Sequence, residues 1–136
     1  NSSPPKYHPY ARDPNLARPW ATPGTPGLEH RIGGLEKANI TGTVNYEPDN
    51  HQVMTLIRKA KVEKVAAFIP PVEPHGAPSG DLLVVGWGGT YGSILTAVNR
   101  ARAAGKRVAS LHLRHLNPLP RNLGEVMRRF ARVLVP

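Results

Sequence analysis

The sequence predicts a three-layer αβα fold in its C-terminal half, preceded by an extended, proline-rich arm. From Asp81 onward, short apolar runs alternate with stretches in which apolar residues recur every three or four positions. This pattern is typical of the order strand, helix, strand, helix, strand, and it implies a mainly parallel sheet with right-handed crossovers. Before residue 28, seven prolines interrupt the chain and prevent regular structure. The 136 residues, 40% of them hydrophobic, suffice for one domain with a core.

Residues 1–28 form the predicted arm. Tyr7, Tyr10 and Trp20 are its candidate apolar anchors, and Arg12 and Asp13 are candidates to fix its register by hydrogen bonds. A proline-rich segment loses less conformational entropy on ordering, so we expect the arm to pack on protein surface, within the chain or on a neighbour. The alternative is a flexible tether.

The middle of the chain predicts one helix. Short β-like runs over residues 29–46 are broken by glycines, and Glu47-Pro48-Asp49-Asn50 then suits a first helical turn. The helix should fade near Phe68, before Pro70. Its predicted apolar side consists of Val53, Met54, Leu56, Ile57 and Ala60.

The sheet begins with a buried strand at Leu82–Val85, followed by a glycine-rich turn and a helix that Gly105 terminates. Val108–Leu113 is the second predicted strand. Asn122 and Glu125 predict a capping box at the start of the next helix, with Val126, Met127 and Phe130 facing inward. A third strand is expected over residues 132–135. A sheet of only three strands would leave a strand edge without a hydrogen-bonding partner. We therefore expect that the sheet is incomplete and that the natural polypeptide continues.

Three segments follow from this reading. Residues 1–46 are the arm and an inter-domain connector, residues 47–80 are a helix and a proline-rich linker, and residues 81–136 are the βαβαβ core.

Charge and composition narrow the functional classes. The formal net charge is +9 and there is no cysteine, so thiolate metal sites and disulfides are excluded within this sequence. The basic surface suits an acidic protein partner, whereas nucleic-acid binding lacks any accompanying motif. Without a membrane-length apolar run or a signal peptide, we expect a cytoplasmic protein that does not enter a membrane.

The turn Gly86–Gly92 is the one candidate anion site. It lies between a strand and a helix, where free backbone amides can bind phosphate, and Gly88, Gly89 and Thr90 are the candidate residues. The spacing is not that of a dinucleotide fingerprint, although Arg114 could suit a 2′-phosphate. A tight turn without ligand explains the glycines equally.

No catalytic or metal site is predicted. His112 and His115 have a spacing that directs their rings to different faces of a strand, so structural roles are expected. Paired carboxylates, a nucleophile–histidine–acid set and a phosphate-loop lysine are all missing from the sequence pattern.

Three stretches, in order, resemble a known family. They are Tyr10–Asp13 with Thr22–Gly24 and Gly27–Lys37; Asn45–Met54; and Leu83–Gly92 with His112–Leu123 and Val133–Pro136. Together they resemble the alpha subunits of 2-oxoglutarate:ferredoxin oxidoreductase and related 2-oxoacid:acceptor oxidoreductases. The matching part is the join between two domains and most of a domain similar to the transketolase C-terminal domain.

The resemblance implies an enzyme that converts a 2-oxoacid, with 2-oxoglutarate preferred, and coenzyme A to an acyl-CoA and carbon dioxide while reducing ferredoxin. It also implies thiamine diphosphate, magnesium and iron–sulfur clusters in the whole enzyme, and a beta subunit as partner. This chain is then a non-catalytic, C-terminal portion of the alpha subunit that supports assembly and binds no cofactor itself. The alternatives from the residues alone are a stand-alone nucleotide- or phosphate-binding α/β module and a nucleic-acid-binding domain.

Overall fold

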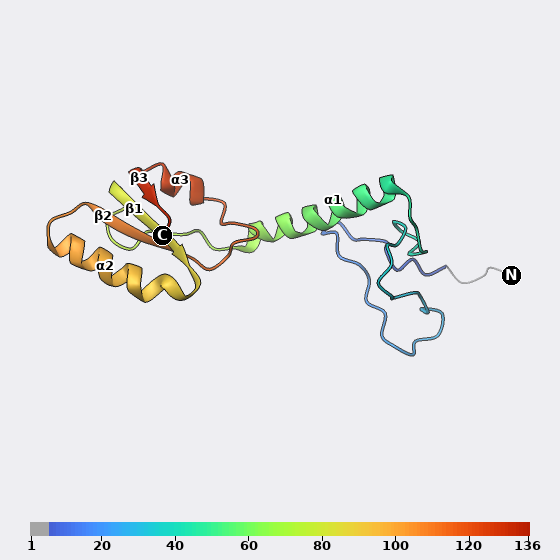
Figure 1. Cartoon of the computed structure of the whole chain (residues 1–136). Helices are drawn as coiled ribbons and strands as arrows, with labels where there is room; N and C mark the ends of the chain where they lie inside the picture. The colour runs from blue at the N-terminus through green and yellow to red at the C-terminus, as the bar shows by residue number, and fades with distance from the viewer. Residues whose placement is uncertain (1–5) are drawn as a thin grey trace. The chain divides into compact units, whose positions relative to one another are not determined.

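The computed structural model describes residues 6–136 and consists of two compact units, Asn1–Lys64 and Val65–Pro136 (Figure 1). Within the described residues, no helix combines the length and apolar character needed to cross a membrane.

The first unit combines one long helix with an irregular segment, residues 6–47, to which the name arm is extended from here on. Residues 6–47 contain turns and two isolated antiparallel bridges, Tyr10 with Ile40 and Lys37 with Val44, so the β-like runs of the sequence do not form strands. Helix α1 spans Pro48–Lys64, with Asp49 in its first turn, as the sequence predicts. A short 3₁₀ helix, η1 (Val65–Phe68), follows and belongs to the second unit.

The predicted apolar side of α1 is mostly not buried. Met54 is buried, but Val53 and Leu56 are exposed. Ile57 and Ala60 are half-buried, so burial of this apolar side within the unit is uneven. Met54, at 1% exposed, and Pro9 are the buried apolar side chains of residues 6–64.

The second unit is built on a three-stranded parallel sheet. Its strands are β1 (Gly80–Trp87), β2 (Val108–Leu113) and β3 (Phe130–Leu134), in the order β2-β1-β3. Leu83 lies opposite Ala109 on one side of β1, and Val84 lies opposite Leu134 on the other. The predicted α/β class with parallel strands is confirmed.

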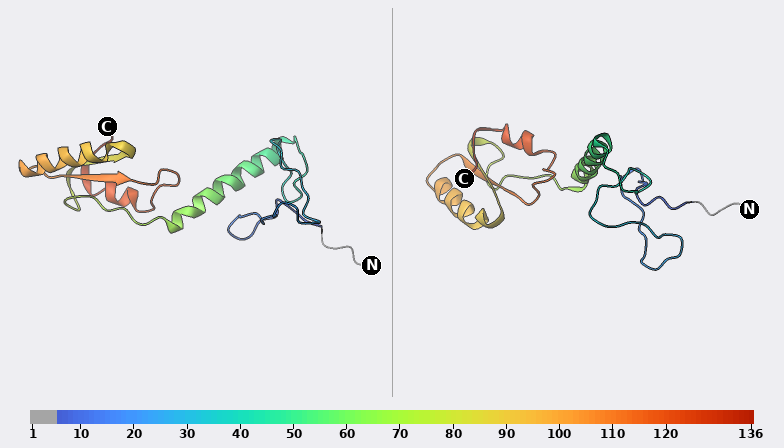
Figure 2. Two further views of the ribbon diagram at one scale, coloured as in Figure 1. Left: turned by 90° about the horizontal axis from the view of Figure 1, so that it is seen from below. Right: turned by 45° about the vertical axis from the view of Figure 1, so that its right-hand side comes forward.

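Helices lie on both faces of this sheet (Figure 2). Helix α2 (Tyr91–Ala103) connects β1 to β2, and the short helix α3 (Leu123–Met127) lies on the opposite face before β3. The first crossover runs from the central strand β1 to β2, and the second runs from β2 past β1 to β3. Right-handed connections that run in opposite directions place their helices on opposite faces of the sheet. The main core lies between the sheet and α3 and contains Leu83, Val85, Ala109, Leu111, Leu113, Leu123, Val126 and Phe130.

Two local predictions around α3 were wrong. The third strand starts at Phe130 rather than residue 132, and Phe130 is buried from the strand instead of from a helix. The predicted capping box does not form, because the Asn122 side chain makes no cap hydrogen bond. Its amide instead binds both backbone groups of Val72, accepting from N at 2.9 Å and donating to O at 2.8 Å.

The two edges of the sheet differ. The outer edge of β2 is covered by His75, which exchanges two backbone hydrogen bonds with Ser110. The outer edge of β3 has no strand partner among residues 6–136, and Val133 and Leu134 are exposed there.

Candidate functional site

The glycine-rich turn lies where α/β sheets commonly bind ligands. The chain moves from β1 outward to β2 and then returns past β1 to β3. The direction of the connections therefore reverses between β1 and β3, and the carboxyl ends of these two strands form the topological switch point of the sheet. The turn contains a 3₁₀ helix, η2 (Gly88–Thr90), which leads directly into α2. The structure thus places the predicted anion candidates Gly88, Gly89 and Thr90 together at this point.

Packing and backbone conformation account for the two best-defined glycines of the turn. A Cβ atom on Gly86 would lie 2.3 Å from Ile94 Cδ1 and 2.7 Å from Thr90 Oγ1, so a side chain there would collide with the start of α2. Gly88 has φ +59°, a left-handed conformation that favours glycine. Neither requirement involves a ligand.

The third candidate uses its hydroxyl inside the turn. Thr90 Oγ1 donates to the carbonyl oxygen of Trp87 at 2.8 Å. The Thr90 proton is therefore engaged, and a bound anion would depend on backbone amides alone. Anion binding at the turn stays a prediction.

The cavity beside the turn is apolar. It has a volume of about 500 Å³ and is lined by Val84, Gly89, Thr90, Ser93, Ile94, Ala97, Val98, Leu134 and Pro136. None of these residues is charged, so nothing in this lining would offset the charge of a phosphate or hold a cation.

The two histidines, His112 within β2 and His115 just after it, have different surroundings. The His112 ring lies 5.0 Å from the Tyr91 ring in an edge-to-face arrangement, whereas His115 is exposed in the following bend beside Arg114. Across residues 6–136, no group of three or more histidine, aspartate or glutamate side chains is placed to hold a metal ion.

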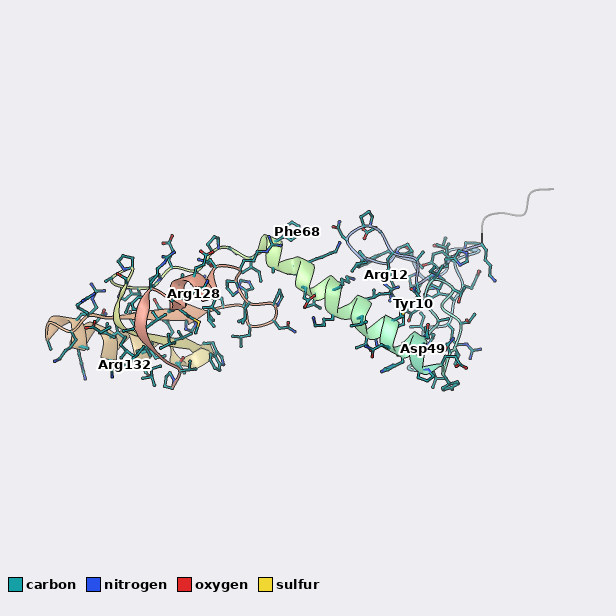
Figure 3. The ribbon with its side chains drawn as sticks, turned by 90° about the horizontal axis from the view of Figure 1, so that it is seen from above. Tyr10, Arg12, Asp49, Phe68, Arg128 and Arg132 are labelled. Atoms are coloured by element: carbon teal, nitrogen blue, oxygen red, sulfur yellow. The ribbon has the colours of Figure 1, made fainter. Side chains whose placement is uncertain are left out.

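The arm has the polar anchor that the sequence suggests. Arg12 Nη1 donates to Tyr10 O at 2.9 Å and to Asn39 Oδ1 at 2.8 Å, and Nη2 lies 3.7 Å from Met54 Sδ on α1 (Figure 3). Partial burial, with a smaller effect from the charge of Arg18, lowers the pKa of Arg12. Asp13 Oδ1 accepts from Ala17 N at 2.8 Å. Both residues therefore order the arm.

The aromatic anchors behave differently from one another. Tyr7 and Tyr10 are partly buried, with the Tyr7 ring 5.4 Å from that of His30. Trp20 is 95% exposed, so it does not anchor the arm within its own unit.

One buried cation could not be recognised from the sequence. Lys37 is 2% exposed, and its Nζ donates to the carbonyl oxygens of Gly33 and Leu35 at 2.6 and 2.5 Å. These acceptors are backbone atoms, which no side-chain pattern announces. Lys37 closes the Gly33–Leu35 loop and has the geometry of a structural residue.

The alpha subunits suggested by the sequence do match this chain. It is 53% identical over 133 residues, 96% of its length, to 2-oxoglutarate oxidoreductase subunit KorA of Mycobacterium tuberculosis. It is 39% identical over 93 residues to subunit alpha of 2-oxoacid:ferredoxin oxidoreductase 1 of Aeropyrum pernix. The chain spans 20% and 15% of the lengths of these relatives. No family model matches.

A solved structure shows the same architecture. The 2-oxoglutarate:ferredoxin oxidoreductase of Magnetococcus marinus, with 2-oxoglutarate, coenzyme A and succinyl-CoA bound, superposes with a TM-score of 0.82 and 31% identity. The match covers 96% of this chain and 23% of that one.

The fold and these matches define an α/β segment that is similar in sequence and architecture to part of the alpha subunits of oxidoreductases. More specifically, the chain is homologous to a segment of the alpha subunits of the 2-oxoacid:ferredoxin oxidoreductases, which confirms the resemblance.

Proposed function

We propose that this chain is the C-terminal portion of the alpha subunit of a thiamine-diphosphate-dependent 2-oxoacid:ferredoxin oxidoreductase, with 2-oxoglutarate as the preferred substrate. The observation that carries the proposal is the 53% identity to a 2-oxoglutarate oxidoreductase subunit over nearly the whole chain. The cytoplasmic enzyme would convert the 2-oxoacid, coenzyme A and oxidised ferredoxin to acyl-CoA, carbon dioxide and reduced ferredoxin, together with a beta subunit.

Within that enzyme, we assign this segment to assembly rather than to chemistry. Its residues do not fit the implied cofactors: there is no cysteine thiolate for an iron–sulfur cluster. The cavity beside the glycine turn has no carboxylate for the magnesium of a diphosphate. Thiamine diphosphate, magnesium and the clusters would accordingly be held outside this segment.

A turnover measurement tests both parts of the proposal. The subunit that contains this chain, purified with its partner, should reduce ferredoxin or a dye in a reaction that needs 2-oxoglutarate and coenzyme A. The isolated 136-residue chain, given thiamine diphosphate and magnesium, should show only background reduction. Turnover by the isolated chain would contradict the assembly role, and an assembled enzyme that accepts no 2-oxoacid would contradict the family assignment.

A further inference from the structure

The arm exposes large apolar side chains that its own unit does not use. Trp20 is 95% exposed and Ile32 is 81% exposed. Isolated exposed apolar residues are common on protein surfaces, but a cluster of them marks an interaction site. These two residues belong to such a cluster.

They line one hollow, which we name the arm hollow. It has a volume of about 310 Å³, and its principal walls are Tyr7, Tyr10, Arg18, Trp20, Arg31 and Ile32. Tyrosine, tryptophan and arginine are the residues most enriched at the energetic centres of protein interfaces, because they combine large apolar area with polar groups.

The charge of the arm hollow is uncompensated. Arg18 lies over the Tyr10 ring, with its guanidinium carbon 4.3 Å from the ring centroid, and Arg31 is exposed. Within residues 6–136, neither arginine forms an ion pair with a carboxylate. The hollow therefore offers two guanidinium groups to an acidic partner beside an apolar floor.

The walls of the arm hollow are held in place before anything binds. Tyr10 N donates to Ile40 O at 3.2 Å, and a Cβ on Gly42 would lie 2.6 Å from Pro9 Cγ, which shows how closely these segments approach. The ring of Tyr7 rests against that of His30. A surface that is already ordered loses less entropy on binding, so more of its contact energy appears as affinity.

Exposure of the rim favours a protein over a small molecule. Sites for small ligands enclose most of the ligand surface. Trp20, by contrast, is almost fully exposed on the rim, so burying it requires a broad partner surface.

We propose that the arm hollow is a docking site for another subunit of the same enzyme. The fitting partner segment places an apolar side chain against Trp20 and Ile32 and one or more carboxylates against Arg18 and Arg31. This inference rests on the proposed function, because it requires a multi-subunit enzyme.

Variants of the whole subunit, expressed with its partner, test the inference. Trp20→Ala should weaken subunit association on the order of 30-fold, as expected for a tryptophan that the partner buries. The double variant Arg18→Glu, Arg31→Glu should slow association, more strongly at low salt than at high salt. Sedimentation velocity over a dilution series and stopped-flow mixing measure these effects.

Matched controls separate docking from general surface changes. Phe68→Ala removes another strongly exposed aromatic residue, and Arg100→Glu reverses an exposed arginine on α2. Neither lines the arm hollow, so both should associate like the wild type. The arm variants should also keep the wild-type unfolding midpoint, since the altered side chains are exposed.

The outcomes distinguish this inference from the proposed function. If the wild-type complex turns over 2-oxoglutarate but the arm variants associate normally, the docking site is wrong while the function stands. If the wild-type complex shows no such turnover, the function itself is wrong. Normal association with a raised KM for coenzyme A would overturn docking in favour of a small-anion site.

Discussion

At the scale of single residues, the glycine turn after β1 illustrates how much of a motif can be structural. Gly86 is required because α2 begins too close for a side chain, and Gly88 is required by its left-handed backbone. Gly92, within the first turn of α2, has neither constraint. The three glycines therefore make different predictions on substitution.

Gly86→Ala should destabilise the second unit by about 1–3 kcal/mol, because the added methyl group overlaps Ile94 and Thr90. Gly92→Ala is the matched control and should be neutral or stabilising by up to about 1 kcal/mol, since alanine favours a helix and nothing lies within 4 Å. Urea denaturation of the subunit measures both. Equal losses at the two positions would contradict the steric account.

Substitution of Asn122 tests the hydrogen bonds between its side chain and the backbone of Val72, which lies 50 positions earlier in the chain. Asn122→Ala should cost about 1–3 kcal/mol, because it leaves the backbone N–H and C=O of Val72 without their partner. Glu125→Ala, at the other position of the predicted capping box, should change stability by less than about 0.5 kcal/mol because Glu125 is exposed. The reverse ranking in a urea titration would restore the capping box.

At the scale of elements, the first turns of α1 are joined to the arm by polar contacts. Asn50 Oδ1 accepts from Asn39 N at 3.0 Å, and Asn50 Nδ2 donates to Lys37 O at 2.9 Å. Glu36 accepts from His51 Nδ1 at 2.6 Å and faces Arg58 Nη1 at 3.5 Å. The hydrogen bond from His51, reinforced by Arg58, lowers the pKa of Glu36.

This shift gives the arm–α1 contact a defined pH dependence. A carboxylate with a lowered folded-state pKa contributes stability above its unfolded pKa, about 4.3, and loses it as the pH falls through the folded value. Glu36→Gln should therefore reduce stability near pH 6 and flatten the acid limb below about pH 4.3. Hydrogen exchange at residues 36–50 across this range would show it. Glu63→Gln, which alters an exposed pair with Lys59, is the control and should keep the wild-type profile.

The sequence predicted those elements whose boundaries are set by residues close together in the chain. Apolar runs located β1 and β2, and Gly105, which has φ +77°, marked the end of α2. The start of β3 was not predicted, because Phe130 suits a helix face and a strand equally well. The clamp of Asn122 on Val72 joins residues 50 positions apart, and such pairings leave no periodic trace.

The prediction of the candidate site was likewise limited to local features. The sequence predicted that Gly88, Gly89 and Thr90 lie in one turn between a strand and a helix. It did not predict that the Thr90 hydroxyl donates a hydrogen bond to the carbonyl oxygen of Trp87. Lys37 escaped prediction because a lysine is ordinarily exposed. The resemblance to the alpha subunits was the sequence-level inference that reached furthest, and the comparisons confirm it.

At the scale of the whole molecule, the two units are stabilised in different ways. The second has an apolar core between its sheet and α3. The first encloses Met54 and Lys37 but leaves Trp20, Ile32 and Tyr46 exposed, and polar contacts hold its arm to α1. A unit with so little core gains stability from a partner that covers it. This contrast favours assembly as the role of the arm.

Hydrogen exchange on the complete subunit, alone and with each potential ligand, tests the assembly role most directly. Adding the partner subunit should slow exchange at the non-proline amides between Tyr7 and Gly27 and around Ile32. Adding thiamine diphosphate, 2-oxoglutarate or coenzyme A without the partner should leave the Gly86–Gly92 amides unchanged. Protection of that turn by one of these small molecules, with an arm that exchanges at the random-coil rate in the assembled enzyme, would contradict the account.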